Sequence, residues 1–208
     1  MKNVLLIGDS IRLGYQKRVG EILGSNVKIY APEENCRFAK YALWTMVSWM
    51  EKFEYPKIDV GHFNAGAWDQ HRCTADGEIF TSLDDYAKDI RRLAIQMKSY
   101  TDNVIFANTT PAGKELNDRV PLNPLINTDE NYPKVYYYAP TNVWNKSVYE
   151  YNKRAEAVVT EMGIPVNDLY SALLADTDKY ISKDGLHPTP EGYELLAQMT
   201  AARIEEML

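Results

Sequence analysis

Short apolar runs alternate with longer amphipathic stretches along the whole chain. The apolar runs are bounded by turn residues, which is typical of strands that are buried on both faces. Five such strands are expected, at residues 3–7, 27–30, 58–63, 104–107 and 164–167. Between them, apolar residues recur at three- and four-residue steps, which predicts helices. The helices are expected at residues 11–23, 38–53, 83–100, 143–162 and from 190 nearly to the end of the chain, with a short helical turn at 171–175.

This alternation predicts a three-layer α/β/α fold, in which helices cover both faces of a five-stranded parallel sheet. We expect the strand order 2-1-3-4-5 and a single domain over residues 1–208. In that order the loops after the first and third strands meet at the carboxyl edge of the sheet. A functional site is therefore expected at this edge.

The first of these loops contains Gly8, Asp9 and Ser10, directly before a helix. A hydroxyl at this position lies beside the free N–H groups of a helix N-terminus, which favour negative charge. That environment suits a nucleophile for acyl transfer. Asp and Ser are also ordinary residues at the start of a helix, so the turn by itself leaves both roles open.

A second polar segment, with Asp184, Gly185 and His187, precedes the last helix. Histidine suits a general base near neutral pH, and a carboxylate on its other ring nitrogen fixes the tautomer. A tight turn at Gly185 can fold Asp184 back onto His187, so one short loop can supply both groups. Alternatively, Asp184 and Gly185 are plain turn residues and His187 is a surface residue before Pro188.

Together the two segments resemble the motifs of the SGNH/GDSL hydrolases, which are serine esterases and lipases on a flavodoxin-like sheet. The resemblance rests on Gly8-Asp9-Ser10 after the first strand, on Asp184 and His187 before the last helix, and on the sheet between them. It implies that Ser10 is the nucleophile, His187 the base and Asp184 the partner of His187. It also implies a carboxylic ester hydrolase that needs no cofactor, in which Asp9 orders the turn.

The loops that build the oxyanion hole in this family depart from the family's pattern here. The glycine after the second strand is replaced by a polar loop that includes Asn35, and Trp68 stands where the third-strand motif has an asparagine. The expected oxyanion donors are Ser10, Asn35, Asn64 and Gly66. Asn35 and Asn64 are equally expected as residues that cap their loops, because Asn is common at such turns.

The same loops suggest the substrate. Trp68, Arg37 and Arg72 are expected near Ser10, and flat aromatic and polar side chains suit a sugar ring better than an acyl chain. We therefore expect an acetyl or other short acyl ester on a carbohydrate. A tyrosine run at 136–138 lies in a long irregular stretch, 110–142, which is expected either to cover the site or to pack as a surface loop.

Two other functions remain open. A lysophospholipase or thioesterase would prefer long acyl chains, although no exposed apolar lid is recognisable in the sequence. A non-catalytic ligand-binding protein on the same fold is favoured by the replacement at Trp68. A metal site at His62, His71, Cys73 and Asp69 is not expected, because these residues lack a typical ligand spacing. No glycine-rich nucleotide motif is present, so no cofactor is expected.

Charge and composition limit the partners. The net charge of −6 and the lack of a basic run argue against a nucleic acid, and the apolar runs are too short to span a membrane. A small-molecule or oligosaccharide ester is the expected partner, and a homo-oligomer remains open. Two cysteines, Cys36 and Cys73, and a first strand that begins close to Met1 favour a cytoplasmic protein without a signal peptide. A leader removed from a secreted form would leave no trace here.

Overall fold

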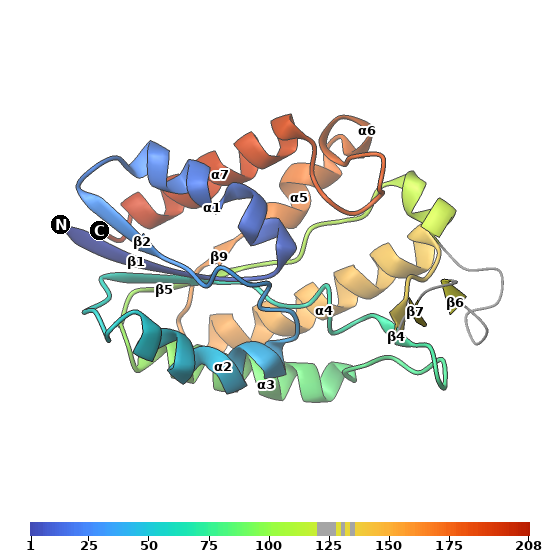
Figure 1. The fold of residues 1–208 in the computed structure, drawn as a ribbon, viewed down its shortest axis with the longest axis horizontal. Helices are drawn as coiled ribbons and strands as arrows, with labels where there is room; N and C mark the ends of the chain where they lie inside the picture. The colour runs from blue at the N-terminus through green and yellow to red at the C-terminus, as the bar shows by residue number, and fades with distance from the viewer. Residues whose placement is uncertain (120–127, 130–131, 134–135) are drawn as a thin grey trace.

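A computed structural model describes residues 1–119, 128–129, 132–133 and 136–208 of the chain (Figure 1). Its centre is a five-stranded sheet in the order β2-β1-β3-β5-β9. Every pair of neighbouring strands is parallel. The strands are β1 (Lys2–Ile7), β2 (Val27–Tyr30), β3 (Val60–Phe63), β5 (Val104–Ala107) and β9 (Val166–Asn167). The predicted strand order is therefore confirmed.

Helices cover both faces of the sheet, which confirms the predicted three layers (Figure 1). One face carries α1 (Ser10–Leu23), α5 (Leu169–Leu174) and α7 (Pro190–Glu205). The other face carries α2 (Ala39–Lys52), α3 (Leu83–Lys98) and α4 (Thr141–Glu161). The two chain termini lie at the amino end of the strands, opposite the edge where the loops after β1 and β3 emerge (Figure 1).

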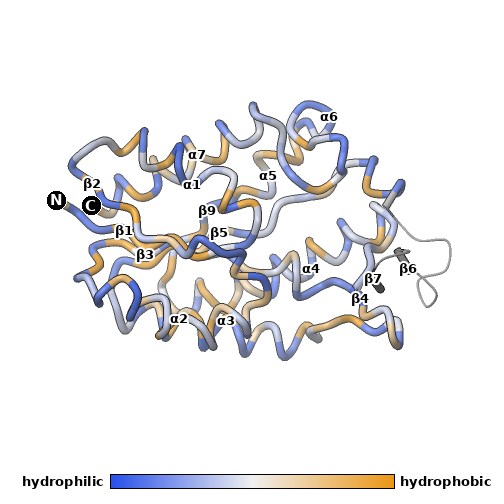
Figure 2. The backbone as a smooth tube through the Cα atoms, in the orientation of Figure 1, coloured by the Kyte–Doolittle hydropathy of each residue, from blue (hydrophilic) through white to orange (hydrophobic). Residues whose placement is uncertain are grey.

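The alternation of side chains along β1 explains the two apolar cores. Val4 and Leu6 pack with α1 and α7, whereas Leu5 and Ile7 pack with α2, α3 and α4. All four side chains are fully buried, as expected of a central strand in a parallel sheet. In Figure 2 the apolar positions gather along the strands of the sheet, and the helices on both sides alternate between apolar and polar positions.

Element boundaries differ from the predictions by a few residues. The strand β9 begins at Val166 and not at 164, because Pro165 has no N–H to donate to a neighbouring strand. Helix α4 begins at Thr141, two residues before the predicted start, and Pro140 occupies its N-cap.

Several short elements were not predicted from the sequence. They are β4 (Arg72–Cys73), the 3₁₀ helix η1 (Lys114–Arg119), β6 (Thr128–Asp129), β7 (Tyr132–Pro133), β8 (Tyr136–Tyr137) and α6 (Thr177–Tyr180). Each is too short to show a hydrophobic period. In the described ranges, no helix combines the length and the apolar character needed to cross a membrane.

Candidate active site

Ser10 lies where β1 passes into α1. Asp9 is the N-cap of α1, and its carboxylate accepts a hydrogen bond from the Ile11 N–H at 3.0 Å. Ser10 is therefore the first helical residue, and its own N–H has no acceptor within the helix. Burial raises the pKa of Asp9, and the bond from Ile11 offsets part of this rise. Asp9 thus orders the turn, as the sequence suggested.

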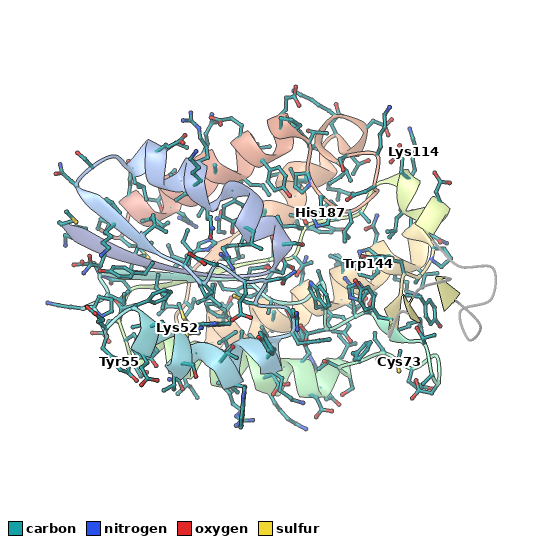
Figure 3. The ribbon with its side chains drawn as sticks, viewed as in Figure 1. Lys52, Tyr55, Cys73, Lys114, Trp144 and His187 are labelled. Atoms are coloured by element: carbon teal, nitrogen blue, oxygen red, sulfur yellow. The ribbon has the colours of Figure 1, made fainter. Side chains whose placement is uncertain are left out.

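The loop before α7 folds back on itself and presents His187. The Ser182 N–H donates to the His187 carbonyl at 2.8 Å, and the Gly185 N–H donates to the Ser182 carbonyl at 2.9 Å. Gly185 has a φ of 75°, which L-residues rarely adopt, and a Cβ at this position would lie 2.1 Å from the Leu116 nitrogen. Only glycine fits this turn. Figure 3 shows His187 at the end of the sheet away from the termini.

The structure brings Ser10, His187 and Asp184 into one hydrogen-bonded chain. The Ser10 Oγ lies 2.8 Å from His187 Nε2, and His187 Nδ1 lies 2.6 Å from Asp184 Oδ2. A carboxylate only accepts, so Nδ1 carries the proton and Nε2 is free to accept from the Ser10 hydroxyl. This arrangement has the geometry of a nucleophile, a base and an orienting carboxylate.

Asp184 is held as an anion by hydrogen bonds. Partial burial raises its pKa, but the bonds from the His187 ring and from the Leu186 and His187 N–H groups outweigh burial and lower the pKa to about 2. The two backbone N–H groups each donate to Oδ1 at 2.8 Å, and the Ser182 hydroxyl donates to the same oxygen at 3.0 Å. The carboxylate therefore has a fixed orientation and a fixed charge.

The loop after β5, which runs into the irregular stretch 110–142, supports this segment in a way that the sequence analysis did not predict. Residues 108–113 follow β5, and the Gly113 N–H donates to the Gly185 carbonyl at 3.0 Å. Two α4 side chains hold the loop by paired bonds to its backbone. Asn152 binds the N–H and the carbonyl of Thr109, each at 2.8 Å, and Asn145 binds those of Ala112 at 2.7 and 2.8 Å. Asn145 and Asn152 are seven residues apart on a predicted helix, and this spacing was the sequence feature that could have pointed to a common role.

Arg12 connects the Ser10 turn to the loop after β2. Its side chain is almost completely buried, yet the guanidinium donates to the carbonyls of Gly8, Pro32 and Glu34. A buried charge is tolerated when its donors are all engaged in this way. The Cys36 N–H also donates to the Gly8 carbonyl, at 3.2 Å. The loop after β2 is thus fixed against the turn that carries Ser10.

Two of the expected oxyanion donors, Asn35 and Asn64, lie in loops that contact this turn. The Asn35 side chain accepts from the Arg37 N–H at 2.8 Å, and its amide nitrogen makes no hydrogen bond in the described part of the chain. One N–H of the Asn64 amide donates to the Ala107 carbonyl at 2.8 Å. Gly66 has a φ of 146°, and a Cβ there would meet the Thr109 hydroxyl at 2.5 Å. Asn35 and Asn64 therefore both support their loops, and each keeps a further donor.

Several solved structures share this fold over nearly the whole chain. A lipase/acylhydrolase from Enterococcus faecalis is 19% identical, with a TM-score of 0.72 over 99% of this chain and 96% of that one. A GDSL-like lipase from Bacteroides thetaiotaomicron is 20% identical, with a TM-score of 0.68 over 100% and 89% of the two chains. An acetyl xylan esterase is 15% identical, with a TM-score of 0.67 over 97% and 99%.

The chain has the SGNH/GDSL hydrolase fold. No protein-family model matches the sequence, and no curated protein does either. The fold resemblance inferred from the two short motifs is thus confirmed by structure.

Trp68 lies in the loop after β3 and belongs to an aromatic cluster. Its ring centroid is 5.7 Å from that of Phe38, 5.3 Å from that of Tyr136 and 5.3 Å from that of His71. His71 also contacts Tyr138 and Trp144. The tyrosines of the 136–138 run that face this cluster therefore pack against the loop after β3.

The two arginines expected at the substrate site are placed differently. The Arg37 guanidinium is exposed and lies over the rings of Tyr41 and Trp68, 5.3 and 5.9 Å from their centroids. Arg72 lies in β4, and its guanidinium donates to the Gly77 carbonyl at 2.9 Å, within the turn that follows. Arg37 is thus associated with the Trp68 loop, whereas Arg72 stabilises a turn.

The four residues weighed as a metal site are dispersed. His62 is fully buried in β3 and contacts Asn167, whereas His71 belongs to the aromatic cluster. Asp69 caps α2 by accepting from the Ala39 N–H, and its burial raises its pKa to about 7 despite that bond. Among the described residues, no group of three or more His, Cys, Asp or Glu side chains is placed to hold a metal ion.

Proposed function

We propose that this protein is a serine hydrolase that cleaves short-chain acyl esters, with the acetyl ester of a carbohydrate as its preferred substrate. The observation that carries the proposal is the hydrogen-bonded chain from Ser10 through His187 to Asp184, with distances of 2.8 and 2.6 Å. The fold supports it, because structures described as lipases, acylhydrolases and an acetyl xylan esterase share this arrangement of strands and helices.

The reaction begins when Ser10 Oγ attacks the ester carbonyl carbon and His187 Nε2 takes the hydroxyl proton. Asp184 stabilises the imidazolium that forms. The tetrahedral intermediate then collapses, His187 gives the proton to the departing alcohol oxygen, and an acyl-enzyme remains. Water attacks this acyl group by the same steps, which releases the acid and restores Ser10.

Donors for the developing oxyanion come from three loops at the carboxyl edge of the sheet. The Ser10 N–H has no acceptor in its helix, and the Gly66 backbone and the spare amide protons of Asn35 and Asn64 complete the set. Loss of one such donor typically lowers a rate by about 10²–10³. Since Trp68 replaces the asparagine of the family motif, we assign the side-chain donor to Asn64.

The proposed substrate follows from the walls of the site. Trp68, Phe38 and Tyr136 form an aromatic surface next to a positive charge on Arg37, which suits a sugar ring.

The first test is hydrolysis of para-nitrophenyl acetate and its longer-chain homologues by the wild type and by Ser10→Ala. We expect the acetyl ester to be cleaved fastest and Ser10→Ala to lose at least about 10³-fold in kcat. Ser25→Ala is the matched control. Ser25 is exposed and follows the end of α1 opposite to Ser10, so this variant should keep full activity. Activity should also fall at acidic pH, because protonated His187 cannot accept the Ser10 proton.

Other outcomes favour the alternatives. Preference for long chains would indicate a lysophospholipase or thioesterase. Equal rates for Ser10→Ala and the wild type would leave Ser10 as the first residue of a helix and nothing more, and would favour a ligand-binding protein. A phosphonate ester probe that modifies Ser10 in the wild type, detected by mass spectrometry, would separate a slow enzyme from an inactive one.

A further inference from the structure

We propose that Arg37 selects for an ester whose alcohol part carries a negative charge, so that the substrate is the acyl ester of an anionic carbohydrate. This inference rests on the proposed function and concerns the same site. It follows from the backbone conformation of Arg37, the contacts that hold its side chain and the position of its loop beside Ser10.

The backbone of Arg37 is strained. Its φ is 50°, in the left-handed region where a Cβ is unfavourable and glycine is preferred. The chain thus keeps a large charged side chain at a position where glycine would fit without strain. Strain of this kind persists at functional sites when the side chain is needed there.

The Arg37 side chain is positioned by its contact with the Tyr41 ring, and this ring is itself held by Glu34. The guanidinium lies over the Tyr41 ring, and the Tyr41 hydroxyl donates to Glu34 at 2.7 Å. The second oxygen of Glu34 accepts from the Trp49 indole N–H at 2.8 Å. Both carboxylate oxygens of Glu34 are thus engaged by neutral donors. These bonds position the ring that supports Arg37 and lower the pKa of Glu34.

Arg37 nevertheless retains its hydrogen-bonding capacity. In the described part of the chain its guanidinium forms no ion pair and no hydrogen bond, and its polar contacts are with the faces of Tyr41 and Trp68. The other arginine expected at the site differs, since Arg72 donates to a backbone carbonyl. An exposed guanidinium fixed on aromatic faces can bind a carboxylate with two parallel hydrogen bonds.

The topology places the loop that carries Arg37 beside the Ser10 turn. Strand β1 lies between β2 and β3, so the loops that carry Arg37 and Trp68 flank the Ser10 turn. The Arg37 guanidinium lies 5.9 Å from the centroid of the Trp68 ring. The Cys36 N–H donates a hydrogen bond to the Gly8 carbonyl, which joins the Arg37 loop to the Ser10 turn. His187 Nε2 protonates the departing alcohol oxygen, so the alcohol part of the ester starts beside Ser10 and His187, and we infer that it extends over the loops of Arg37 and Trp68. A protein of net charge −6 needs a local cation to bind an anionic substrate.

The test compares meta- and para-acetoxybenzoate, which carry a carboxylate at two distances from the ester, with the matching acetoxybenzamides, which are neutral. We expect the ratio of kcat/KM for acid over amide to fall about tenfold in Arg37→Met, because one charge-assisted pair is lost. Arg37→Lys should keep part of the preference, and raised salt should weaken it in the wild type. Arg72→Met is the matched control and should leave the ratio unchanged.

Two further measurements separate the possible failures. Arg37→Gly removes the strain and the charge together, so it should fold at least as stably as the wild type and still lose the preference. Para-acetoxybenzenesulfonate distinguishes a site for a planar carboxylate from a site for a tetrahedral anion. An unchanged acid-to-amide ratio in Arg37→Met, with Ser10→Ala inactive on both probes, would overturn the role of Arg37 and keep the esterase.

If the wild type cleaves none of the probes, the proposed function fails, and the anion site is then tested by binding alone. The affinities of para-hydroxybenzoate and para-hydroxybenzamide for the wild type and for Arg37→Met are measured by titration calorimetry and compared. Tighter binding of the acid that depends on Arg37 supports the site. Equal binding of the two ligands overturns it.

Discussion

At the scale of single residues, the site depends on a few backbone positions as much as on the polar side chains. Gly185 is the clearest case, because its turn brings Asp184 and His187 together. Its φ of 75° and its contact with the Leu116 backbone leave no space for a side chain. A glycine that a sequence offers only as a turn residue is therefore a determinant of the geometry of the base.

Substitution of this glycine should affect catalysis strongly. In Gly185→Ala the positive φ costs about 1–2 kcal/mol of stability, and the overlap with Leu116 displaces the loop. Since a misplacement of about 1 Å can cost about 10²-fold in rate, we expect kcat for an acetyl ester to fall by that order.

Gly163→Ala provides the matched control for this prediction. Gly163 has a similar φ of 70°, but no atom lies within 4 Å of a Cβ built there. It should lose a comparable part of the free energy of unfolding and keep its kcat. Equal kcat values for the two variants, measured beside thermal unfolding curves, would contradict a special role for the Gly185 turn.

At the scale of elements, helix α4 acts as a support for the loop between β5 and η1. Asn145 and Asn152 are seven residues apart and project from the same side of the helix. Each pairs with both backbone groups of one loop residue, as a neighbouring strand would. The loop in turn binds the Gly185 carbonyl through Gly113. The segment that carries Asp184 and His187 therefore depends on α4, a helix that contributes neither Ser10, Asp184 nor His187.

This support predicts a stability defect in Asn152→Asp. The carboxylate can still accept from the Thr109 N–H, but it places an oxygen against the Thr109 carbonyl in a buried position. We expect the free energy of unfolding, measured by urea titration, to fall by about 3 kcal/mol at neutral pH. Asn145→Asp, at a less buried position, should lose less. A larger loss in Asn145→Asp would contradict this account.

At the scale of the whole molecule, a buried histidine makes stability depend on pH. His62 lies in β3 between β1 and β5, and desolvation lowers its pKa from 6.5 to about 4. The unfolded chain therefore binds a proton below about pH 6.5 that the folded protein does not bind until about pH 4. Stability is lost as the pH falls through this window.

The expected size of this effect can be measured. Between pH 7 and pH 5, His62 should lower the free energy of unfolding by about 2 kcal/mol. In His62→Leu this part of the pH dependence should disappear, because an apolar side chain suits the layer of Val60 and Ile105 and does not titrate. Urea titrations of both proteins at the two pH values give the comparison. The same difference in both proteins would exclude His62 as its source.

The sequence by itself determined the strand order, the two faces of the sheet and the positions of Ser10, Asp184 and His187. It could do so because buried strands and amphipathic helices have distinct periods, and because the two motifs lie at turns next to these elements. The parallel topology then brings the ends of distant strands to one edge. These features follow from patterns that extend over only a few neighbouring residues.

Only the tertiary structure decided how the surrounding loops complete the site. The left-handed backbone of Arg37, the paired bonds of Asn152, the buried Arg12 and the separation of Arg37 from Arg72 all arise from contacts between segments far apart in the chain. Such contacts leave no period in the sequence, because each depends on the direction of one side chain toward one distant backbone group. The sequence therefore predicted the three polar residues that the fold brings together, and the packing of the loops determined what supports them.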